Sequence, residues 1–276
     1  MDETPTLGVE GVRKEYGSVT ALDGVDLSVE GPEIVGVAGP NGSGKTTLIH
    51  CLLGLERPTA GETRVGGRSS RSFAAADRER IGYMPQETAV YDDLTVRENV
   101  AFFARLYGVG VGRLSGALGR SRAGDGAARE DRARAVADAL ETVELADRAD
   151  ARVDGLSGGM VRRTSLACAL VHDPDVLFLD EPTVGLDPQL RASMWREFRE
   201  RRDDGAIVVV STHYLGEVTN CDRVVFLRGG RVLAFDAPEA FLESTGTDDM
   251  EDAFLALLED ADRDPDRVAP SSGGER

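Results

Sequence analysis

The segment whose residues point most clearly to a chemical role is a glycine-rich stretch that follows a short apolar run. It fits the pattern Gly-xxxx-Gly-Lys-Thr and comprises Gly39, Pro40, Asn41, Gly42, Ser43, Gly44, Lys45, Thr46 and Thr47. Glycines allow consecutive backbone N–H groups to converge on a phosphate, because no Cβ stands in the way. Lys45 can reach the β- and γ-phosphates of a nucleotide, and the Thr46 hydroxyl can ligate Mg²⁺. The pattern predicts a phosphate-binding loop.

Two adjacent carboxylates follow a second apolar run, residues 176–179. At the carboxyl end of a buried strand, Asp180 can hold Mg²⁺ through a water molecule, and Glu181 can then polarise an attacking water. Taken alone, the pair fits a strand end with solvated acids equally well. The phosphate-binding loop favours the metal role for Asp180.

A further glycine pair lies at residues 156–160, just before an expected helix. Ser157 has the type of an N-cap residue, and Gly158 and Gly159 would leave backbone N–H groups bare at the helix N-terminus. Residues 114–117, Leu-Ser-Gly-Ala, nearly repeat the pattern, so the motif alone is weak. Its position, 20 residues before the acidic strand end, favours 156–160 as a second anion site.

Hydrophobic periodicity predicts the elements that position these residues. We expect strands over 7–30, 34–38, 176–179 and 207–211, a hairpin over 224–233, and helices over 48–55, 188–202 and 250–258. A helical region over 87–150 has Val96, Val100, Phe103 and Leu106 on one face, and 108–128 has the composition of a flexible insertion. Alternating strands and helices indicate an α/β fold with a mainly parallel sheet. Residues 260–276 are acidic and polar, which predicts disorder.

Length and composition restrict the class of protein. The chain has 276 residues, 41% of them hydrophobic, so it can bury a sizeable core. A formal net charge of −17 argues against general nucleic-acid binding. No apolar run approaches the roughly 18–20 residues that span a bilayer, and no secretory signal opens the chain, so we expect a soluble intracellular protein. Three distant cysteines predict buried free thiols rather than a metal or disulfide framework.

The charged residues are unusual in kind. The chain has 30 arginines but only two lysines, Lys14 and Lys45, beside 27 aspartates. Self-repulsion at this net charge opposes compaction, and concentrated salt screens it. This composition resembles that of salt-in halophilic archaea. An arginine bias from a GC-rich genome combined with an acidic tail is the alternative.

Together, these motifs resemble those of the nucleotide-binding subunit of an ABC transporter, over roughly residues 4–235. The phosphate-binding loop corresponds to Walker A, residues 156–160 to the signature loop, and residues 176–181 to Walker B. The resemblance implies four further roles: Tyr16 stacks on adenine, Gln86 contacts Mg²⁺ and water, Asp187 of the D-loop makes a cross-dimer contact, and His213 contacts the γ-phosphate. It implies ATP and Mg²⁺ as cofactors, with catalytic roles for Glu181, His213, Gln86 and Lys45, and Mg²⁺ ligation by Thr46, Gln86 and Asp180.

The resemblance also implies an organisation and partners. We expect a P-loop NTPase core with a parallel sheet, an antiparallel β subdomain and an inserted helical subdomain. The ATP-binding domain would cover 1–236, with the helical subdomain at about 87–159, followed by a C-terminal helix and tail over 237–276. The implied partners are a separately encoded membrane permease and a second copy or a paralogous subunit, with no nucleic acid. The implied location is the cytoplasmic face of the membrane.

Two positions depart from the usual family pattern. Met160 stands where the signature commonly has Gln, and Val184-Gly185 stands where Ser-Ala is common in the D-loop. Met160 with Arg162-Arg163, the segment 212–214 and the segment 250–257 resemble the drug and polysaccharide exporter branch. We therefore expect an exporter subunit.

Two alternatives come from other classes of protein. A soluble ABC ATPase acting in DNA repair would need a long coiled-coil insertion, and ribosome-acting types usually carry two cassettes, whereas this chain has neither sustained heptads nor a second cassette. A regulatory module without turnover is disfavoured by the presence of Lys45, Asp180, Glu181 and His213.

Overall fold

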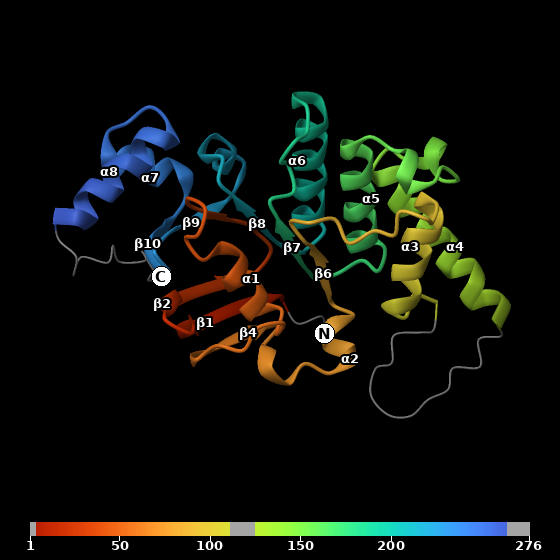
Figure 1. The fold of residues 1–276 in the computed structure, drawn as a ribbon, viewed down its shortest axis with the longest axis horizontal. Helices are drawn as coiled ribbons and strands as arrows, with labels where there is room; N and C mark the ends of the chain where they lie inside the picture. The colour runs from red at the N-terminus through yellow and green to blue at the C-terminus, as the bar shows by residue number, and fades with distance from the viewer. Residues whose placement is uncertain (1–3, 111–124, 264–276) are drawn as a thin grey trace. The chain divides into compact units, whose positions relative to one another are not determined.

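The computed structural model describes residues 4–110 and 125–263, and within them the chain forms two compact units. The first unit is drawn from Met1–Ser72 and Arg199–Arg276, and the second is Phe73–Phe198. In the order of the sequence, the second unit thus falls between the two segments that make up the first (Figure 1).

An antiparallel sheet in the first unit has the strand order β2-β1-β4-β5. Its strands are β1 (Thr6–Tyr16), β2 (Val19–Glu30), β4 (Ala60–Val65) and β5 (Arg68–Ser69). The segment predicted as short strands over 7–30 is therefore one long hairpin. Opposed residues such as Val9 and Leu27 bury alternate positions on one face. At a bulge in β1, the Gly11 N–H donates to the Asp26 carboxylate at 2.7 Å.

Parallel strands in the first unit position the phosphate-binding loop. β3 (Ile34–Ala38) is buried along its whole length and lies between β8 (Ile207–Thr212) and β9 (Arg223–Arg228), parallel to both. The predicted hairpin is β9 with β10 (Arg231–Asp236). In this register Ala38 opposes Thr212, so the residues that follow β3 and β8 emerge at the same edge of the sheet.

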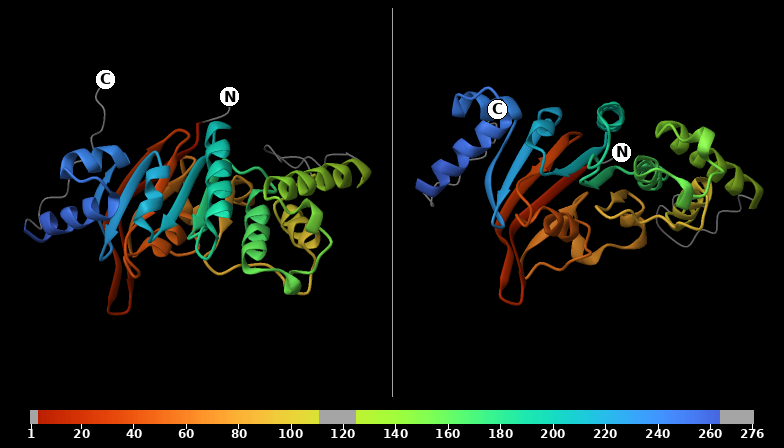
Figure 2. Two further views of the ribbon diagram at one scale, coloured as in Figure 1. Left: turned by 90° about the horizontal axis from the view of Figure 1, so that it is seen from above. Right: turned by 45° about the horizontal axis from the view of Figure 1, so that its top comes forward.

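Helices complete the first unit. α1 (Lys45–Leu52) starts at the glycine loop and contacts β2 and β4. After β8 come a 3₁₀ helix (Leu215–Asn220) and, beyond β10, α7 (Pro238–Thr245) and α8 (Met250–Arg263), which lie side by side (Figure 2). The rings of Phe241 and Phe254 pack on Phe226 of β9 at 4.9 and 5.1 Å between centroids. α8 runs past its predicted end at residue 258, and Arg263 pairs with Glu259 in its last turn. Residues 264–276 of the predicted acidic tail lie outside the described residues.

The second unit contains two parallel strands and most of the long helices. β6 (Ile81–Met84) pairs with β7 (Val176–Asp180), with Met84 opposite Leu179. The helices are α2 (Ala75–Arg78), α3 (Val96–Leu106), α4 (Asp125–Thr142), α5 (Gly158–Leu170) and, as far as Phe198, α6 (Pro188–Asp203), with short 3₁₀ helices at Ala146–Arg148 and Val153–Gly155. α3, α4 and α5 contact one another, and α5 packs on β6. That contact is close, because a Cβ at Gly82 would lie 2.6 Å from the carbonyl oxygen of Ala169.

The buried face of α3 differs from the predicted one. Val96, Asn99, Val100 and Ala104 are buried, whereas Leu106 is 64% exposed. Val96, Val100 and Ala104 are spaced four residues apart and therefore lie on one face of the helix. Leu106, at the end of the helix, does not fall in this row. Asn99 interrupted the apolar pattern in the sequence, yet it is fully buried, because its amide bonds the backbone of Tyr91 and Thr95. The predicted insertion over 108–128 lies mostly outside the described residues.

Candidate functional site

The glycine loop between β3 and α1 has the backbone that an anion cradle requires. Gly39, Gly42 and Gly44 all have positive φ, at 152°, 79° and 110°. A Cβ at Gly39 would clash with the Leu227 carbonyl oxygen, and one at Gly44 would lie 2.6 Å from the carbonyl oxygen of Ala21. No residue with a side chain fits either position, so the loop can bring bare N–H groups and the N-terminus of α1 to one anion.

Lys45, the first residue of α1, bends back over this loop. Only 6% of the residue is exposed, and its ammonium donates to the carbonyl oxygens of Gly39 at 2.8 Å and Pro40 at 3.2 Å. Both acceptors are neutral, so phosphate oxygens at the loop would be stronger partners for the charge. Thr46 follows within the first turn and is half-buried.

Tyr16 lies at the end of β1 with 45% of its surface exposed. Lys14 lies over its ring, with Nζ 4.7 Å from the centroid, which is cation–π distance. The same ammonium donates to a Glu56 carboxylate oxygen at 2.6 Å and to the Arg57 carbonyl at 2.9 Å. The hydrogen bond to Glu56 raises the pKa of Lys14, which keeps it charged. Sequence reasoning gave Lys14 no role, because its hydrogen-bond partners Glu56 and Arg57 lie more than 40 residues away.

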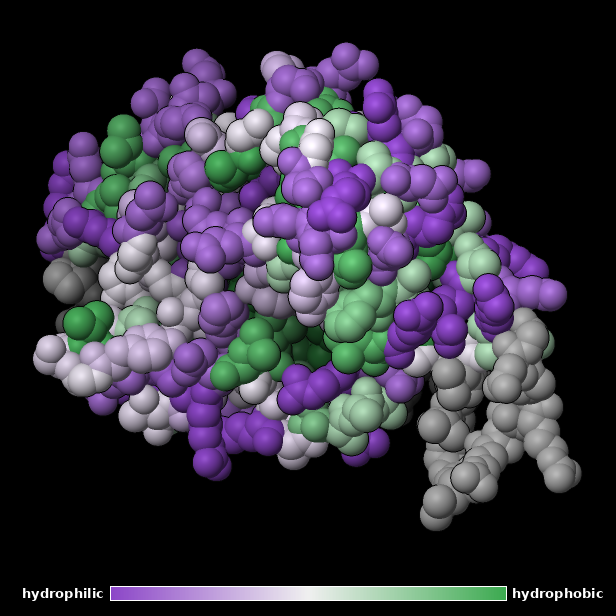
Figure 3. Space-filling view, turned by 45° about the vertical axis from the view of Figure 1, so that its right-hand side comes forward, coloured by the Kyte–Doolittle hydropathy of each residue, from purple (hydrophilic) through white to green (hydrophobic). Residues whose placement is uncertain are grey.

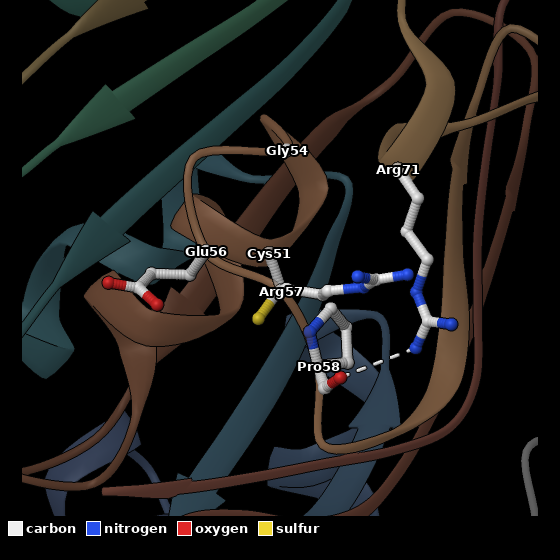
Figure 4. A pocket seen from close by; sticks show the side chains of 6 residues that line it. All are labelled: Cys51, Gly54, Glu56, Arg57, Pro58 and Arg71. Carbon is white, nitrogen blue, oxygen red and sulfur yellow. Dashed lines mark hydrogen bonds between the residues drawn. The ribbon is translucent and has the colours of Figure 1, made fainter.

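A cavity of about 260 Å³ lies beyond the C-terminal end of α1 (Figure 4). Its lining residues are Cys51, Gly54, Glu56, Arg57, Pro58 and Arg71. The Arg71 guanidinium donates to the carbonyl oxygen of Pro58 at 3.3 Å. None of the lining residues belongs to the phosphate-binding loop, so this cavity is separate from that loop.

His213 directly follows β8, as Gly39 directly follows β3. Since Ala38 and Thr212 are opposed in the parallel register, His213 and the start of the glycine loop share one edge of the sheet. Its ring packs against Tyr214 at 4.2 Å between centroids. The first unit thus brings together two of the predicted site segments, the start of the glycine loop at Gly39 and His213, from positions 174 residues apart.

In the second unit, Gln86 and Glu181 are in direct contact. Gln86 Nε2 donates to a Glu181 carboxylate oxygen at 3.1 Å. The parallel pairing of β6 with β7 explains the contact, because both residues follow the carboxyl ends of neighbouring strands. Asp180 ends β7 and is fully buried. The predicted Walker B and Q-loop residues therefore meet within one unit.

The signature segment starts α5. Ser157 is its N-cap, with the Met160 N–H 3.4 Å from Ser157 Oγ, which is a long hydrogen bond. Ser157 and Gly158 are exposed, and a Cβ at Gly158 would meet no atom within 4 Å. Ser157 and Gly158 at the N-terminus of α5 therefore lie at the surface.

Asp187 has a local role that the family pattern did not predict. Its Oδ1 accepts hydrogen bonds from the N–H groups of Gln189 and Leu190, both at 3.0 Å. The carboxylate thus caps the N-terminus of α6.

Neither cysteines nor clustered carboxylates form a metal site in the described ranges. Cys51, Cys168 and Cys221 are buried free thiols. Within residues 4–110 and 125–263, no group of three or more His, Cys, Asp and Glu side chains is arranged to hold a metal ion. Among these same residues, no helix has the length and apolar character needed to cross a membrane.

Comparisons with known proteins agree with this arrangement. The family model described as "ABC transporter" matches residues 22–184. The chain is 42% identical over 234 residues to "Nod factor export ATP-binding protein I" of Burkholderia orbicola (strain AU 1054), covering 84% of this chain and 71% of that protein. It is 33% identical over 256 residues to "Probable multidrug ABC transporter ATP-binding protein YbhF" of Escherichia coli (strain K12), covering 91% of this chain and 41% of that protein.

Solved structures show the same fold. An ATP-binding subunit of an ABC transporter superposes with a TM-score of 0.77 at 26% identity, covering 91% of this chain and 99% of that one. A dimeric ATP-binding cassette in a post-hydrolysis state with ADP and Pi has a TM-score of 0.71 at 26% identity, covering 84% and 98%. The predicted α/β P-loop NTPase fold is confirmed, and these proteins give the soluble DNA-repair or ribosome alternative no support.

These findings also confirm the predicted enzyme class. The relatives are ATP-binding proteins of exporters, and subunits of this kind dimerise and work with membrane permeases. The chain belongs to the ABC transporter family, as an ATP-binding and ATP-hydrolysing subunit of the exporter type.

Proposed function

We propose that ATP hydrolysis by this chain drives transport through an exporter whose membrane permease is encoded separately. The observation that carries the proposal is the glycine loop, in which three positive-φ glycines leave the backbone bare and Lys45 lies against the loop carbonyls. On binding ATP, Lys45 would exchange these carbonyls for the β- and γ-phosphate oxygens. Tyr16, with Lys14 on its ring, would stack on the adenine.

We propose that Thr46, Gln86 and Asp180 hold Mg²⁺. The hydroxyl of Thr46, the side-chain carbonyl of Gln86 and the carboxylate of Asp180 all offer oxygen, which is the ligand type this ion prefers. When bound, Mg²⁺ would offset negative charge on the β- and γ-phosphates. Glu181 would act as general base on the attacking water, oriented by the Gln86 amide that it already contacts. His213 would hold the γ-phosphate in the geometry of the transition state.

We propose that the active form is a head-to-tail pair, formed with a second copy or a paralogous subunit. Ser157, Gly158 and Gly159 of one subunit would close over the γ-phosphate held by the other, because they start a helix at which Ser157 and Gly158 are exposed. Asp187 would contribute to the contact across the pair. Binding of ATP would drive closure, and hydrolysis would release it.

The helical subdomain, at about 87–159, is our proposed docking face for the permease. Tyr91, Phe102 and Leu106 form an exposed apolar patch there, with the rings of Tyr91 and Phe102 at 5.2 Å. Figure 3 shows hydrophobic (green) surface among hydrophilic side chains on one face of the molecule. Asn99 bonds both the N–H and the carbonyl of Tyr91, which fixes the patch to α3. Docking there would hold the chain at the cytoplasmic face of the membrane.

We also propose a salt-rich cytoplasm as the working environment. The support is compositional: a net charge of −17, with arginine supplying 30 of the 32 basic side chains. Concentrated salt would screen the repulsion among 49 acidic side chains.

Two variants test the ATPase assignment. Glu181→Gln should bind ATP and accumulate as a dimer while turnover falls by about a hundredfold or more. Lys45→Ala should lose nucleotide binding or turnover. Near-normal hydrolysis by either variant would remove that residue from its proposed role. A pull-down from native membranes in detergent and high salt tests the permease, and recovery of soluble partners alone would contradict it.

A further inference from the structure

Glu181 has a backbone conformation that requires support. Its φ is +50°, in the left-handed region, which a residue with a Cβ adopts only where its surroundings hold it. The next residue is Pro182, which restricts the backbone of Glu181 further. The direction of the Glu181 side chain is therefore set by whatever fixes this short turn.

The guanidinium of Arg162 on α5 makes the contacts that fix it. Its Nε donates to the Pro182 carbonyl oxygen at 2.7 Å, and one terminal nitrogen donates to the carbonyl oxygen of Glu181. The same nitrogen lies 3.5 Å from the Asp180 carbonyl oxygen. The planar guanidinium offers donors on separate nitrogens to these successive carbonyls, whereas a lysine offers a single nitrogen. Burial lowers the pKa of Arg162, and the carboxylates of Glu181 and Asp180 act against that effect.

The other terminal nitrogen of Arg162 reaches the Q-loop. It donates to the Gln86 carbonyl oxygen at 3.2 Å, while the Gln86 side-chain amide donates to the Glu181 carboxylate at 3.1 Å. Arg162 thus holds the backbone of both residues, and their side chains hold each other. All these contacts lie within the second unit.

Arg162 also connects the turn to the signature motif. It lies on α5 five residues after Ser157, little more than one helical turn from the exposed N-terminus of that helix. A shift at the start of α5 would move the guanidinium and, through it, the backbone of Glu181.

We propose that Arg162 is a positioning residue for hydrolysis, which aligns the Glu181 carboxylate and makes that alignment depend on the position of the signature helix. The inference rests on the proposed role of Glu181 as general base. Arg162 itself would touch neither ATP nor the attacking water.

The test compares Arg162→Met, Arg162→Lys and the control Arg163→Met. Methionine keeps the length of the side chain and removes every donor. Arg163 follows on the same helix and also donates to two carbonyls, those of Val143 and Glu144, at 3.2 and 3.1 Å, outside the catalytic turn. We would measure kcat, KM for ATP, the Kd of a fluorescent ATP analogue, and the thermal midpoint. Arg162→Met should lower kcat by about 10- to 100-fold, with the Kd within about threefold of the parent. Arg162→Lys should be intermediate, and Arg163→Met should keep kcat within about twofold.

A second comparison separates positioning from structural support. If Arg162 acts through Glu181, adding Arg162→Met to Glu181→Gln should change the residual turnover by less than about twofold. Parental kcat in Arg162→Met, equal losses in both arginine variants, or fully additive losses in the double variant would each overturn the inference. Parental turnover in Glu181→Gln alone would overturn the proposed base and this inference together. Loss in Glu181→Gln without loss in Arg162→Met would overturn only the role of Arg162.

Discussion

Replacing Ser157 should change the stability of the protein and its ATPase activity by different amounts, so the two effects can be measured separately. As the N-cap of α5, its Oγ accepts from the Met160 N–H at 3.4 Å, near the outer limit of a hydrogen bond, and the residue is exposed. N-cap substitutions cost about 0.5–2 kcal/mol, and a bond this long belongs at the lower end. We expect Ser157→Ala to cost about 0.5 kcal/mol, which lowers the melting midpoint by about 1–2 °C.

The effect on ATPase activity should be much larger. If the Ser157 hydroxyl donates to the γ-phosphate bound by the other subunit, its loss removes a hydrogen bond to a charged group, worth about 1.5–3 kcal/mol. Since 1.4 kcal/mol corresponds to a factor of ten, turnover should fall by about 10- to 100-fold. Activity should be measured at protein concentrations that allow pairing, beside thermal unfolding of the same samples.

Thr95→Ala provides the matched control. Thr95 caps α3 in a full capping box, with the Glu98 N–H 3.1 Å from its hydroxyl and its own N–H 2.8 Å from the Glu98 carboxylate. This variant should lose about 1 kcal/mol, more than Ser157→Ala, yet keep its turnover per folded molecule. If Ser157→Ala proves the less stable of the two, or keeps full turnover, the reasoning is wrong and Ser157 is only a cap.

Three further predictions follow from the described geometry and charge. A Cβ at Gly42 would meet no atom within 4 Å, so Gly42→Ala should cost only the left-handed strain of about 1–2 kcal/mol. A Cβ at Gly39 would clash with the backbone of Leu227, so Gly39→Ala should lower the melting midpoint much further or prevent folding; equal melting midpoints of the two variants would contradict this. Burial raises the pKa of Cys51 to about 11 and raises that of Cys168 and Cys221 further. Because the thiolate is the reactive form, labelling by a disulfide reagent should be negligible at pH 7, increase about tenfold per pH unit, and reach Cys51 first; rapid labelling at pH 7 would refute it. Finally, the melting midpoint should rise from dilute buffer to molar potassium chloride, and full stability in dilute buffer would exclude a salt-dependent fold.

Local patterns in the sequence predicted the elements and the loop well. Strand β3, the glycine segment and α1 are contiguous, so their order alone specifies the geometry of the cradle. The two acidic residues at the end of β7 could be predicted for the same reason. In both places the chemistry depends on residues within a few positions of one another, and periodicity is strongest at that range.

Contacts between distant segments were not predictable. The Lys14–Glu56 pair spans 42 positions and the Gln86–Glu181 contact spans 95, so no spacing rule connects them. From the sequence, Arg162 could be assigned only to a helix that resembles one in the family. Its contacts could not be predicted, because its acceptors are backbone carbonyl oxygens, which every residue has. The left-handed backbone of Glu181 was hidden similarly, since glutamate carries no signal for that conformation.

The near-absence of lysine has a practical consequence for chemical probing. Across these 276 residues, side-chain amines occur only at Lys14 and Lys45, which are 9% and 6% exposed. Amine-directed acylation, which on most proteins marks the whole surface, would here address one residue against the Tyr16 ring and one folded over the glycine loop. A mass shift mapped to the peptide that contains Lys45, and its suppression by nucleotide, would therefore report occupancy of the loop without any engineered label.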